Sequence, residues 1–380
     1  MLRTIYRFEL KKLFCSRVNI IALAGSVLML ILLADSSIAE ARPVSREAAE
    51  ELNGREIDGQ LIDELKPALK YVNGTTVMEI TGEYEKYVPV MDVLDVMITS
   101  IDEDIDLTEI RENGLYERRE QELVQRLEIQ GLTEKDKEFW MKRETMVQKP
   151  FVYRCHRGPG NLLRAFQALG FFILLLSAVG LSGSYARESA DSMNQLLLCS
   201  RYGKKELYYI KLAAGFTWSI TAALIVFLSV MIPYFSIYGL EGTGEMLQLV
   251  KPMSMLPCTI GHMLVVYFGI YLLAAVLFAA VTMLLSVITQ NQLATICGLM
   301  GYLLIDLFVE FPDRYSLLQK IWLLRPNAIL MNSGFSNYRL IYLAGRLFLN
   351  YQAAPVLYAI IVIAALLIGQ RKYKRLQVGN

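Results

Sequence analysis

Few residues of this chain have the type and spacing that catalysis or metal binding requires. Its 2 histidines, His156 and His262, lie far apart and show no metal-ligand spacing. The 5 cysteines form no C-x-x-C pair: Cys15, Cys155, Cys199, Cys258 and Cys297. The Gly203-Lys204 dipeptide does not belong to a phosphate-binding loop, because Leu198 stands where the first glycine of that loop is needed. The sequence therefore predicts a chain that needs no metal or cofactor and has no ATPase activity of its own.

Two acids, Asp306 and Glu310, lie in or just beyond an apolar stretch at 293–308. An ionisable side chain inside lipid is costly and usually marks a functional site. Both acids, however, fall near one end of the stretch, where water reaches the chain. We therefore expect hydrated acids at the membrane interface rather than a buried functional pair.

The polar segment at 185–211, YARESADSMNQLLLCSRYGKKELYYIK, lies between two apolar stretches. From 187 to 199 its pattern is that of an amphipathic helix, and Glu188 near the start would favourably meet the positive end of the helix dipole. One face of that helix is apolar: Ala190, Met193, Leu196 and Leu197. Its apolar area is modest and its acids would repel anionic lipid, so a helical hairpin that fits a groove on a partner protein is favoured over a membrane-surface helix. A plain surface loop remains the alternative.

Charged and apolar residues are segregated along the chain. Hydrophobic residues make up 54% of the 380 residues, and 20% are charged. Of the 37 acids and 38 bases, 28 acids and 17 bases lie at 35–160, so that segment is acidic and the remainder is basic. This division excludes an ordinary soluble protein and predicts an acidic soluble domain joined to a membrane part with basic edges.

The apolar stretches have the length of membrane-spanning helices. A helix rises about 1.5 Å per residue, so crossing about 30 Å of hydrocarbon takes roughly 20 apolar residues. Six stretches fit this requirement: 18–34, 162–185, 212–235, 258–288, 293–308 and 352–369. The fourth is longer than one straight crossing needs and contains Gly261 and Gly269, so we expect a bend or an extension there. The expected fold is an α-helical membrane protein with six transmembrane helices.

The basic residues predict the orientation of these helices. Fourteen lysines and arginines lie at the N-terminus (3–17), in the loop after the second stretch (187–211) and in the tail (371–375), against six in the opposing short loops. Short cytoplasmic loops are enriched in such residues, so we expect a multi-pass cell-membrane protein with both termini in the cytoplasm. Residues 1–34 would form an interfacial helix and the first transmembrane helix, 35–160 an extracytoplasmic domain, and 161–380 the other five transmembrane helices.

The start of the chain has a second interpretation. Positive residues, an apolar run and Ala39-Glu40-Ala41 resemble a signal peptide with its cleavage site. The apolar run is longer than the core of a usual signal peptide, and the charged region before it is long. A retained membrane anchor is therefore favoured.

The acidic segment is expected to be mainly helical. At 115–144 it has apolar residues at helical spacing: Leu123, Leu127 and Ile129. Gly131 predicts the end of that helix, and Thr133 followed by Asp136 predicts the N-cap of the next one. The acidic face could attract cationic ligands such as peptides, although a solvated surface on a small packed domain is the favoured interpretation.

Two motifs near the ends of apolar stretches form a recognisable pattern. The N-terminal segment RFELKKLFCSR carries an acid-Lys-Lys motif at Glu9, Lys11 and Lys12. Tyr185 and Glu188 form an aromatic-x-x-Glu motif. The loop at 186–211 continues with paired leucines, an arginine and a final lysine: Leu196, Leu197, Arg201 and Lys211. Together with six spans, these motifs resemble those of the permease subunits of type-2 ABC exporters, the ABC-2 family.

The match to the ABC-2 loop motif is incomplete. Asp191 and Ser192 stand where a Gly-Thr pair is usual, and Cys199 stands where proline is usual. These departures concern the local turn of the loop. The segment at 35–160 is a larger insertion than the simplest members of the family carry, and it contributes no motif to the resemblance.

The resemblance implies a division of labour between subunits. Such permeases work in the lipid bilayer as homodimers or heterodimers, and each is bound to an ATPase made from a separate chain. The cytoplasmic loop rests in a cleft on the ATPase and passes ATP-driven closure to the spans. The expected ATPase-coupling residues are Glu188, Leu196, Leu197, Arg201 and Lys211, and those of the interfacial helix are Glu9, Lys11 and Lys12. No nucleic-acid partner is expected, and the substrate is left open.

Two other classes of protein remain as alternatives. An ion-coupled secondary transporter would show paired ionisable residues or broken helices at the midplane of matching halves, and the sequence contains no internal repeat. A membrane sensor would bind its ligand through the acidic segment and would have to act through a partner, since its expected cytoplasmic parts are only loops and tails.

Overall fold

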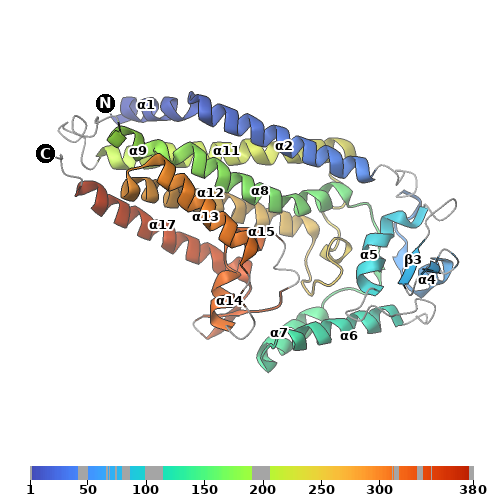
Figure 1. Ribbon diagram of the computed structural model, residues 1–380. Coiled ribbons are helices and arrows are strands. Elements are labelled where there is room, and N and C mark those ends of the chain that lie inside the picture. Colours follow the sequence, from blue (N-terminus) through green and yellow to red (C-terminus); the bar gives the residue numbers. More distant parts are fainter. Residues whose placement is uncertain are drawn as a thin grey trace.

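The computed structural model is predominantly helical, and its long helices lie side by side in a bundle (Figure 1). The structure describes residues 2–41, 50–65, 67, 69–72, 75–78, 86–98, 114–190, 206–309, 311, 316–331, 337–343 and 345–375. The first helix and the C-terminal end of the last helix lie at one end of the bundle, here named the terminal end (Figure 1). The described elements between residues 50 and 153 lie at the opposite, distal end and form the distal domain.

Five helical spans among the described residues are long and apolar enough to cross a membrane: Arg17–Ile38, Arg157–Glu188, Glu206–Tyr238, Ile260–Thr289 and Asn350–Lys374. They belong to the helices α2 (Arg17–Ala41), α8 (Arg157–Leu181) with α9 (Gly183–Ala190), α11 (Glu206–Tyr238), α12 (Ile260–Thr289) and α17 (Asn350–Lys374). Each span overlaps one of the apolar stretches expected from the sequence. The helical composition is that of a multi-pass membrane protein.

The sixth expected stretch forms α13 (Gln292–Phe308), whose 17 residues make it shorter than the five spans. At 1.5 Å per residue it extends only about 25 Å. Gln290 ends α12 with a left-handed φ of 50°. Asn291 then caps α13 by accepting hydrogen bonds from the N–H groups of Leu293 and Ala294. This short connection makes α12 and α13 antiparallel neighbours.

The 30 residues of α12 correspond to about 45 Å of helix, which exceeds the thickness of the hydrocarbon core. Neither Gly261 nor Gly269 interrupts the helix. The helix therefore continues without a break over all 30 residues. Gly261 is required sterically, because a Cβ atom at this position would lie 2.7 Å from the carbonyl oxygen of Thr243.

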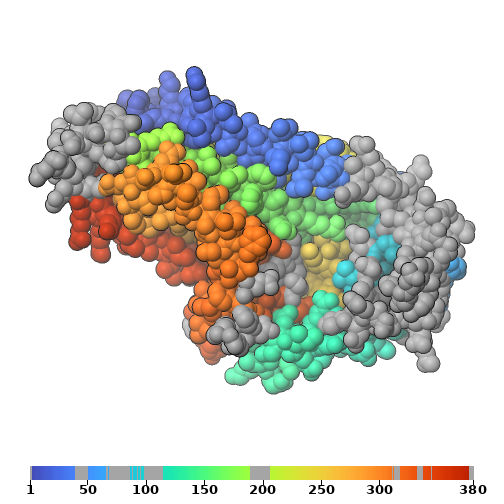
Figure 2. Space-filling view, in the orientation of Figure 1, coloured from blue at the N-terminus to red at the C-terminus, as the bar shows by residue number. Residues whose placement is uncertain are grey.

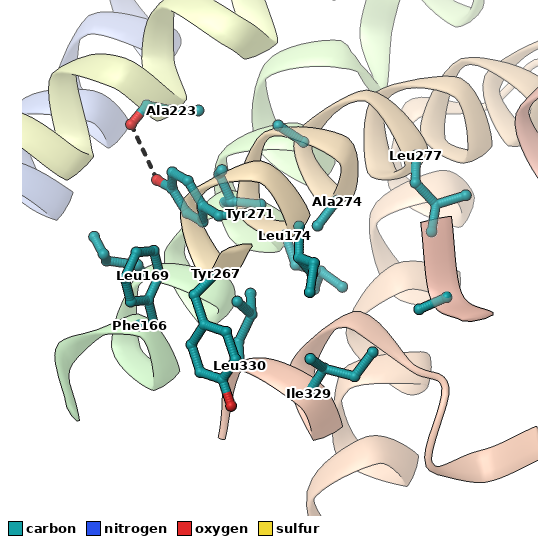
Figure 3. Packing of buried hydrophobic residues seen from close by; sticks show 14 of the residues in the cluster. Phe166, Leu169, Leu174, Ala223, Tyr267, Tyr271, Ala274, Leu277, Ile329 and Leu330 are labelled. Carbon is teal, nitrogen blue, oxygen red and sulfur yellow. Dashed lines mark hydrogen bonds between the residues drawn. The ribbon is translucent and has the colours of Figure 1, made fainter. Parts of the chain in front are cut away.

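α12 packs most extensively against α8 and α17. Buried side chains of α8 and α12 interlock at this contact, and Figure 3 shows Phe166, Leu174 and Tyr267 among them. The hydroxyl group of Tyr271 donates a hydrogen bond to the Ala223 carbonyl of α11 at 3.0 Å (Figure 3). This bond satisfies a polar group that would be costly to leave unpaired in an apolar interior.

The distal domain contains short helices and two small strand pairs. Its helices are α4 (Gly59–Leu65), α5 (Val88–Ile98), α6 (Gly114–Ile129) and α7 (Glu134–Glu144). The antiparallel pairs are β1 (Glu56–Ile57) with β4 (Phe151–Val152) and β2 (Leu69–Val72) with β3 (Thr75–Met78). Helices thus predominate among the described residues of this part of the chain, as the sequence predicts, whereas the strand pairs were not expected.

Local features of the distal domain follow from its sequence. The N-cap predicted at Thr133 is confirmed, since its hydroxyl oxygen accepts a hydrogen bond from the Asp136 N–H at 3.4 Å. Gly131, where the preceding helix was expected to stop, has a positive φ of 60° just after α6. Leu249, from the 3₁₀ helix η4 (Leu247–Leu249), is buried in the same apolar core as Phe151. The core of the distal domain therefore includes a residue from the loop between α11 and α12.

Arg119 of α6 fixes the distal domain to that loop. Its guanidinium group donates to the Pro252 carbonyl at 2.8 Å and to the Ser254 carbonyl at 3.1 Å. It also forms an ion pair with Glu144 of α7, and its side chain is completely buried. Lys149 approaches the same carboxylate at 2.9 Å. Arg119 thus joins α6 to α7 and to two backbone carbonyl groups of the loop between α11 and α12.

A second attachment joins α7 to the segment between α13 and α17. This segment contains α14 (Ser316–Trp322), α15 (Pro326–Leu330), β5 (Ile341–Leu343) and β6 (Arg346–Phe348). The indole N–H of Trp140 donates to the Tyr338 carbonyl at 2.6 Å, and the two rings stack edge to face. We name Arg119, Glu144 and Trp140 the distal clamp. Figure 2 shows the surface of α6 and α7 (teal) below the distal end of the bundle.

Candidate functional site

Four of the residues selected from the sequence meet at the terminal end of the bundle: Glu9, Lys12, Glu188 and Lys211. We name this group the ion cluster. Lys11 is exposed on α1 (Leu2–Phe14) and is not part of it. Leu196, Leu197 and Arg201 lie outside the described residues. The structure therefore brings together half of the expected site residues, from three helices.

Lys211 is at the centre of the ion cluster. Its ammonium group donates to Glu188 Oε1 at 2.5 Å, to Glu9 Oε2 at 3.2 Å and to the Ser184 carbonyl at 3.3 Å. An ammonium group has three N–H donors, so all of them are used. The Lys211 side chain is only 1% exposed. A buried lysine of this kind is retained only with charge and hydrogen-bond partners, because an isolated charge is very costly to bury.

Lys12 completes the ion cluster from its solvent-exposed side. Its ammonium group lies 3.0 Å from Glu188 Oε1 and 3.4 Å from Glu9 Oε1, and the side chain is 45% exposed. Partial burial opposes the charged form of Lys12. The carboxylates of Glu9 and Glu188 outweigh that effect and raise the pKa of Lys12 above its ordinary value. The cluster thus contains two acids and two bases.

The local positions of these residues explain why they can meet. Glu9 and Lys12 are three residues apart on α1 and so lie on one face of that helix. Glu188 lies two residues before the end of α9, and Lys211 is the sixth residue of α11. The segment expected to contact an ATPase leaves the described structure after Ala190 and re-enters it at Glu206. The cluster therefore ties α1 to both ends of that segment.

The expected role of Glu188 as the first acid of a separate helix is wrong. Glu188 is in the second half of α9, which follows α8 almost without interruption. The pairing of Glu188 with Lys211 and Lys12 accounts for its position, because the helix must continue to this point to bring the carboxylate to both ammonium groups. Its contact is with cations rather than with a helix dipole.

Ser286 of α12 stabilises the start of α9. Its hydroxyl oxygen accepts from the N–H groups of Tyr185 at 3.3 Å and Ala186 at 3.2 Å, and it donates to the Ser182 carbonyl at 2.6 Å. The first N–H groups of a helix have no carbonyl acceptor within the helix, so the Ser286 hydroxyl oxygen serves as their acceptor. Ser286 was not among the residues selected from the sequence. A hydroxyl side chain within the apolar α12 is a weak sign of this role, because Thr282 and Thr289 of the same helix share it.

Asp306 forms a second polar site, at the distal end. Its carboxylate forms an ion pair with Arg325 and accepts a hydrogen bond from the Asn327 amide at 2.7 Å. Asp306 is only 7% exposed. The expectation of a hydrated interfacial acid is therefore wrong for Asp306, because a guanidinium group and an amide replace its water. Glu310 lies outside the described residues.

A cavity of about 750 Å³ adjoins Asp306 and is lined mainly by one face of α8. Arg157, Asn161 and Arg164 follow each other at helical spacing along this face, and Phe171 and Phe172 come next. The lining thus changes from cationic and polar to aromatic along the helix. Such a surface is suited to a molecule with a polar end and an apolar end. We name this space the distal cavity.

No group of three or more His, Cys, Asp or Glu side chains within the described ranges could hold a metal ion. The chain matches no protein-family model, and neither a curated protein nor a solved structure is similar to it.

Proposed function

We propose that this chain is the permease subunit of an ABC-2 type exporter, driven by an ATPase made from a separate chain. In this proposal α13 crosses the membrane with the five longer spans, both termini are cytoplasmic, and the distal domain is extracytoplasmic. A second permease subunit completes the transporter. The chain itself binds and moves the substrate and catalyses no reaction.

The ion cluster is the observation that carries the proposal. Its members were selected from two motifs in separate parts of the sequence, and Glu9 lies 3.2 Å from Lys211, although 202 positions separate them in the chain. A motif match that arose by chance would give no reason for such contacts. The cluster also lies where the loop that resembles the ATPase-contacting loop begins and ends.

The geometry suggests how a displacement of that loop would reach the membrane helices. α8 and α9 together form one span, and α11 forms the next. Glu188 and Lys211 link these two spans through a buried ion pair, and Ser286 links the start of α9 to α12. A push on the loop would therefore move three packed helices together, as in rigid-body switching between two arrangements. ATP binding at the partner would bias the choice between them.

The distal cavity supports an amphipathic substrate. Its cationic and aromatic parts lie on one helix face, and its volume of about 750 Å³ falls within the usual range of roughly 300–1,000 Å³ for small-molecule sites. Asp306 would not repel an anionic group there, because Arg325 already neutralises it. We assign the head of the substrate to the arginine end and its apolar part to the phenylalanine end.

A charge reversal in the loop tests the function. Arg201→Glu should abolish co-purification of the ATPase, because losing one side of a charged interface contact typically costs about 2–5 kcal/mol. The matched control is Lys374→Glu, which reverses an exposed cation outside the loop. Both variants should insert and melt like the parent protein. Equal retention of the ATPase by Arg201→Glu and by the parent would disprove the coupling role of the loop.

A further inference from the structure

A cavity of about 700 Å³ lies beside the ion cluster, between α1, α9 and the first turns of α11. We name it the terminal cavity. One part of its wall is apolar and is formed by Ile5, Phe8, Leu13, Leu207 and Ala214. The other part is polar and includes the ion cluster with Ser184 and Arg187. The volume is sufficient for a lipid headgroup and the first part of its acyl chains.

The polar wall has acceptors that the protein does not satisfy. Glu188 Oε1 accepts from both lysines of the cluster, but Glu188 Oε2 is buried without a hydrogen-bond partner among the described residues. The Ser184 hydroxyl is also buried without a hydrogen-bond partner among the described residues. A buried polar atom without a partner costs about 1–3 kcal/mol. A ligand that donates hydrogen bonds to this wall would remove that cost.

The same wall also has cationic donors at its exposed edge. Lys12 uses its N–H groups on the two cluster acids, yet its side chain is 45% exposed. Arg187 is exposed, and its Nε donates to the Gln292 side chain at 2.9 Å. A guanidinium group has five N–H donors, so Arg187 can bind an anion through its other donors while its Nε stays bonded to Gln292. Cations and an unsatisfied carboxylate oxygen thus lie side by side.

The apolar wall is open to its surroundings through α1. Phe8 is 61% exposed and Leu2 is 47% exposed, and no residue of this described helix is buried. Tyr6 nevertheless holds α1 against α11 through a 2.8 Å hydrogen bond with Thr217. An amphipathic helix held beside a span in this way places apolar side chains where acyl chains would lie.

We propose that the terminal cavity binds a membrane phospholipid whose headgroup carries both a phosphate and a primary ammonium group. The phosphate binds Arg187 and Lys12, the ammonium group donates to Glu188 Oε2, and the acyl chains lie against Phe8 and Leu13. The ammonium–carboxylate contact explains selection for this headgroup, because no donor among the described residues reaches Glu188 Oε2. This inference requires only that the chain lies in a membrane and does not depend on the proposed ATPase partner.

The test varies the lipid instead of the protein. The purified chain, without any ATPase, is loaded with lipids of identical acyl chains that carry ethanolamine, N-methylethanolamine, N,N-dimethylethanolamine or choline, and native mass spectrometry counts the retained lipids. Each methyl group removes one N–H donor, so retention should fall along the series, by about tenfold between ethanolamine and choline. Soluble phosphoethanolamine should compete only weakly, because it lacks the apolar part. Equal retention along the series, or stronger retention of a phosphatidylglycerol than of the ethanolamine lipid, overturns the proposal.

Two variants locate the site. Arg187→Gln should lower retention of every lipid in the series, whereas Arg371→Gln, an exposed cation at the same end, should not. Undiminished retention of the ethanolamine lipid by Arg187→Gln places the lipid elsewhere and also overturns the assignment. A lost ATPase contact in Arg201→Glu leaves this preference intact, so the two proposals fail separately.

Discussion

The two ends of the helical bundle are held together in different ways. At the distal end, Arg119 donates to two backbone carbonyl groups and Trp140 to a third, so the clamp fixes the chain itself. At the terminal end, the ion cluster joins helices chiefly through side-chain pairs, and one oxygen atom of Glu188 serves two lysines. Backbone contacts have one geometry, whereas flexible lysine side chains can follow a moving carboxylate. The contrast indicates a rigid distal end and an adjustable terminal end.

The cavities show the same contrast. The acid beside the distal cavity, Asp306, has both carboxylate oxygens engaged, by Arg325 and Asn327. The acid beside the terminal cavity, Glu188, keeps Oε2 without a partner within the described structure. A fully satisfied group resists rearrangement, whereas an unsatisfied one gains from a new contact. The terminal end is therefore the place where a ligand or partner can alter the balance of interactions.

Removal of Arg119 should have the largest effect. Arg119→Met strands the Pro252 carbonyl group, leaves the Ser254 carbonyl with the Gln248 amide as its donor and removes one of the two cations beside Glu144. We expect a loss of about 3–5 kcal/mol in stability. Hydrogen exchange of residues 247–259 should rise strongly. Arg126→Met is the control, because its pair with Glu122 is partly exposed and should contribute about 1 kcal/mol or less. If Arg119→Met and Arg126→Met lose equal stability, the distal clamp is no more rigid than a partly exposed ion pair.

Removal of Lys211 should have the next largest effect. Lys211→Met leaves Glu9 and Glu188 with Lys12 as the only cation of the ion cluster. We expect the free energy of unfolding, measured by thermal unfolding, to fall by about 3 kcal/mol. The exchange Glu188→Lys with Lys211→Glu restores an opposite pair and should recover part of the loss. An adjustable cluster tolerates this exchange. If the double variant is no more stable than Lys211→Met, the cluster is as geometrically strict as the clamp.

The pH dependence of Lys12 should be the smallest effect. Its pKa is raised in the folded protein, so its contribution to stability is fully present below its unfolded pKa of about 10.4 and is lost as the pH rises through the folded value. The stability difference between the parent protein and Lys12→Gln should be constant from pH 8 to 9.5 and shrink above about pH 10.5. A difference that grows with pH would contradict the raised pKa and the pairing behind it.

Local rules of sequence determined much of this protein. Apolar stretches of nearly 20 residues or more define the spans, because backbone groups in lipid must pair within the helix. The Thr133 cap and the stop at Gly131 are fixed by residues within one turn. The acid-Lys-Lys motif also selected Glu9 and Lys12, and the loop pattern at 186–211 selected Glu188 and Lys211.

Only the tertiary structure decided how those residues are used. Whether Glu188 faces a helix dipole or two lysines depends on α1 and α11, which are remote in the sequence, and hydropathy carries no information about such pairing. The same holds for Asp306, whose burial depends on Arg325 and Asn327, and for Arg119, whose two carbonyl acceptors are more than 130 positions away. Charges that are distant in the chain become buried partners when packing excludes water from between them. Each charge then needs the other, because a buried charge without a partner carries a large desolvation cost.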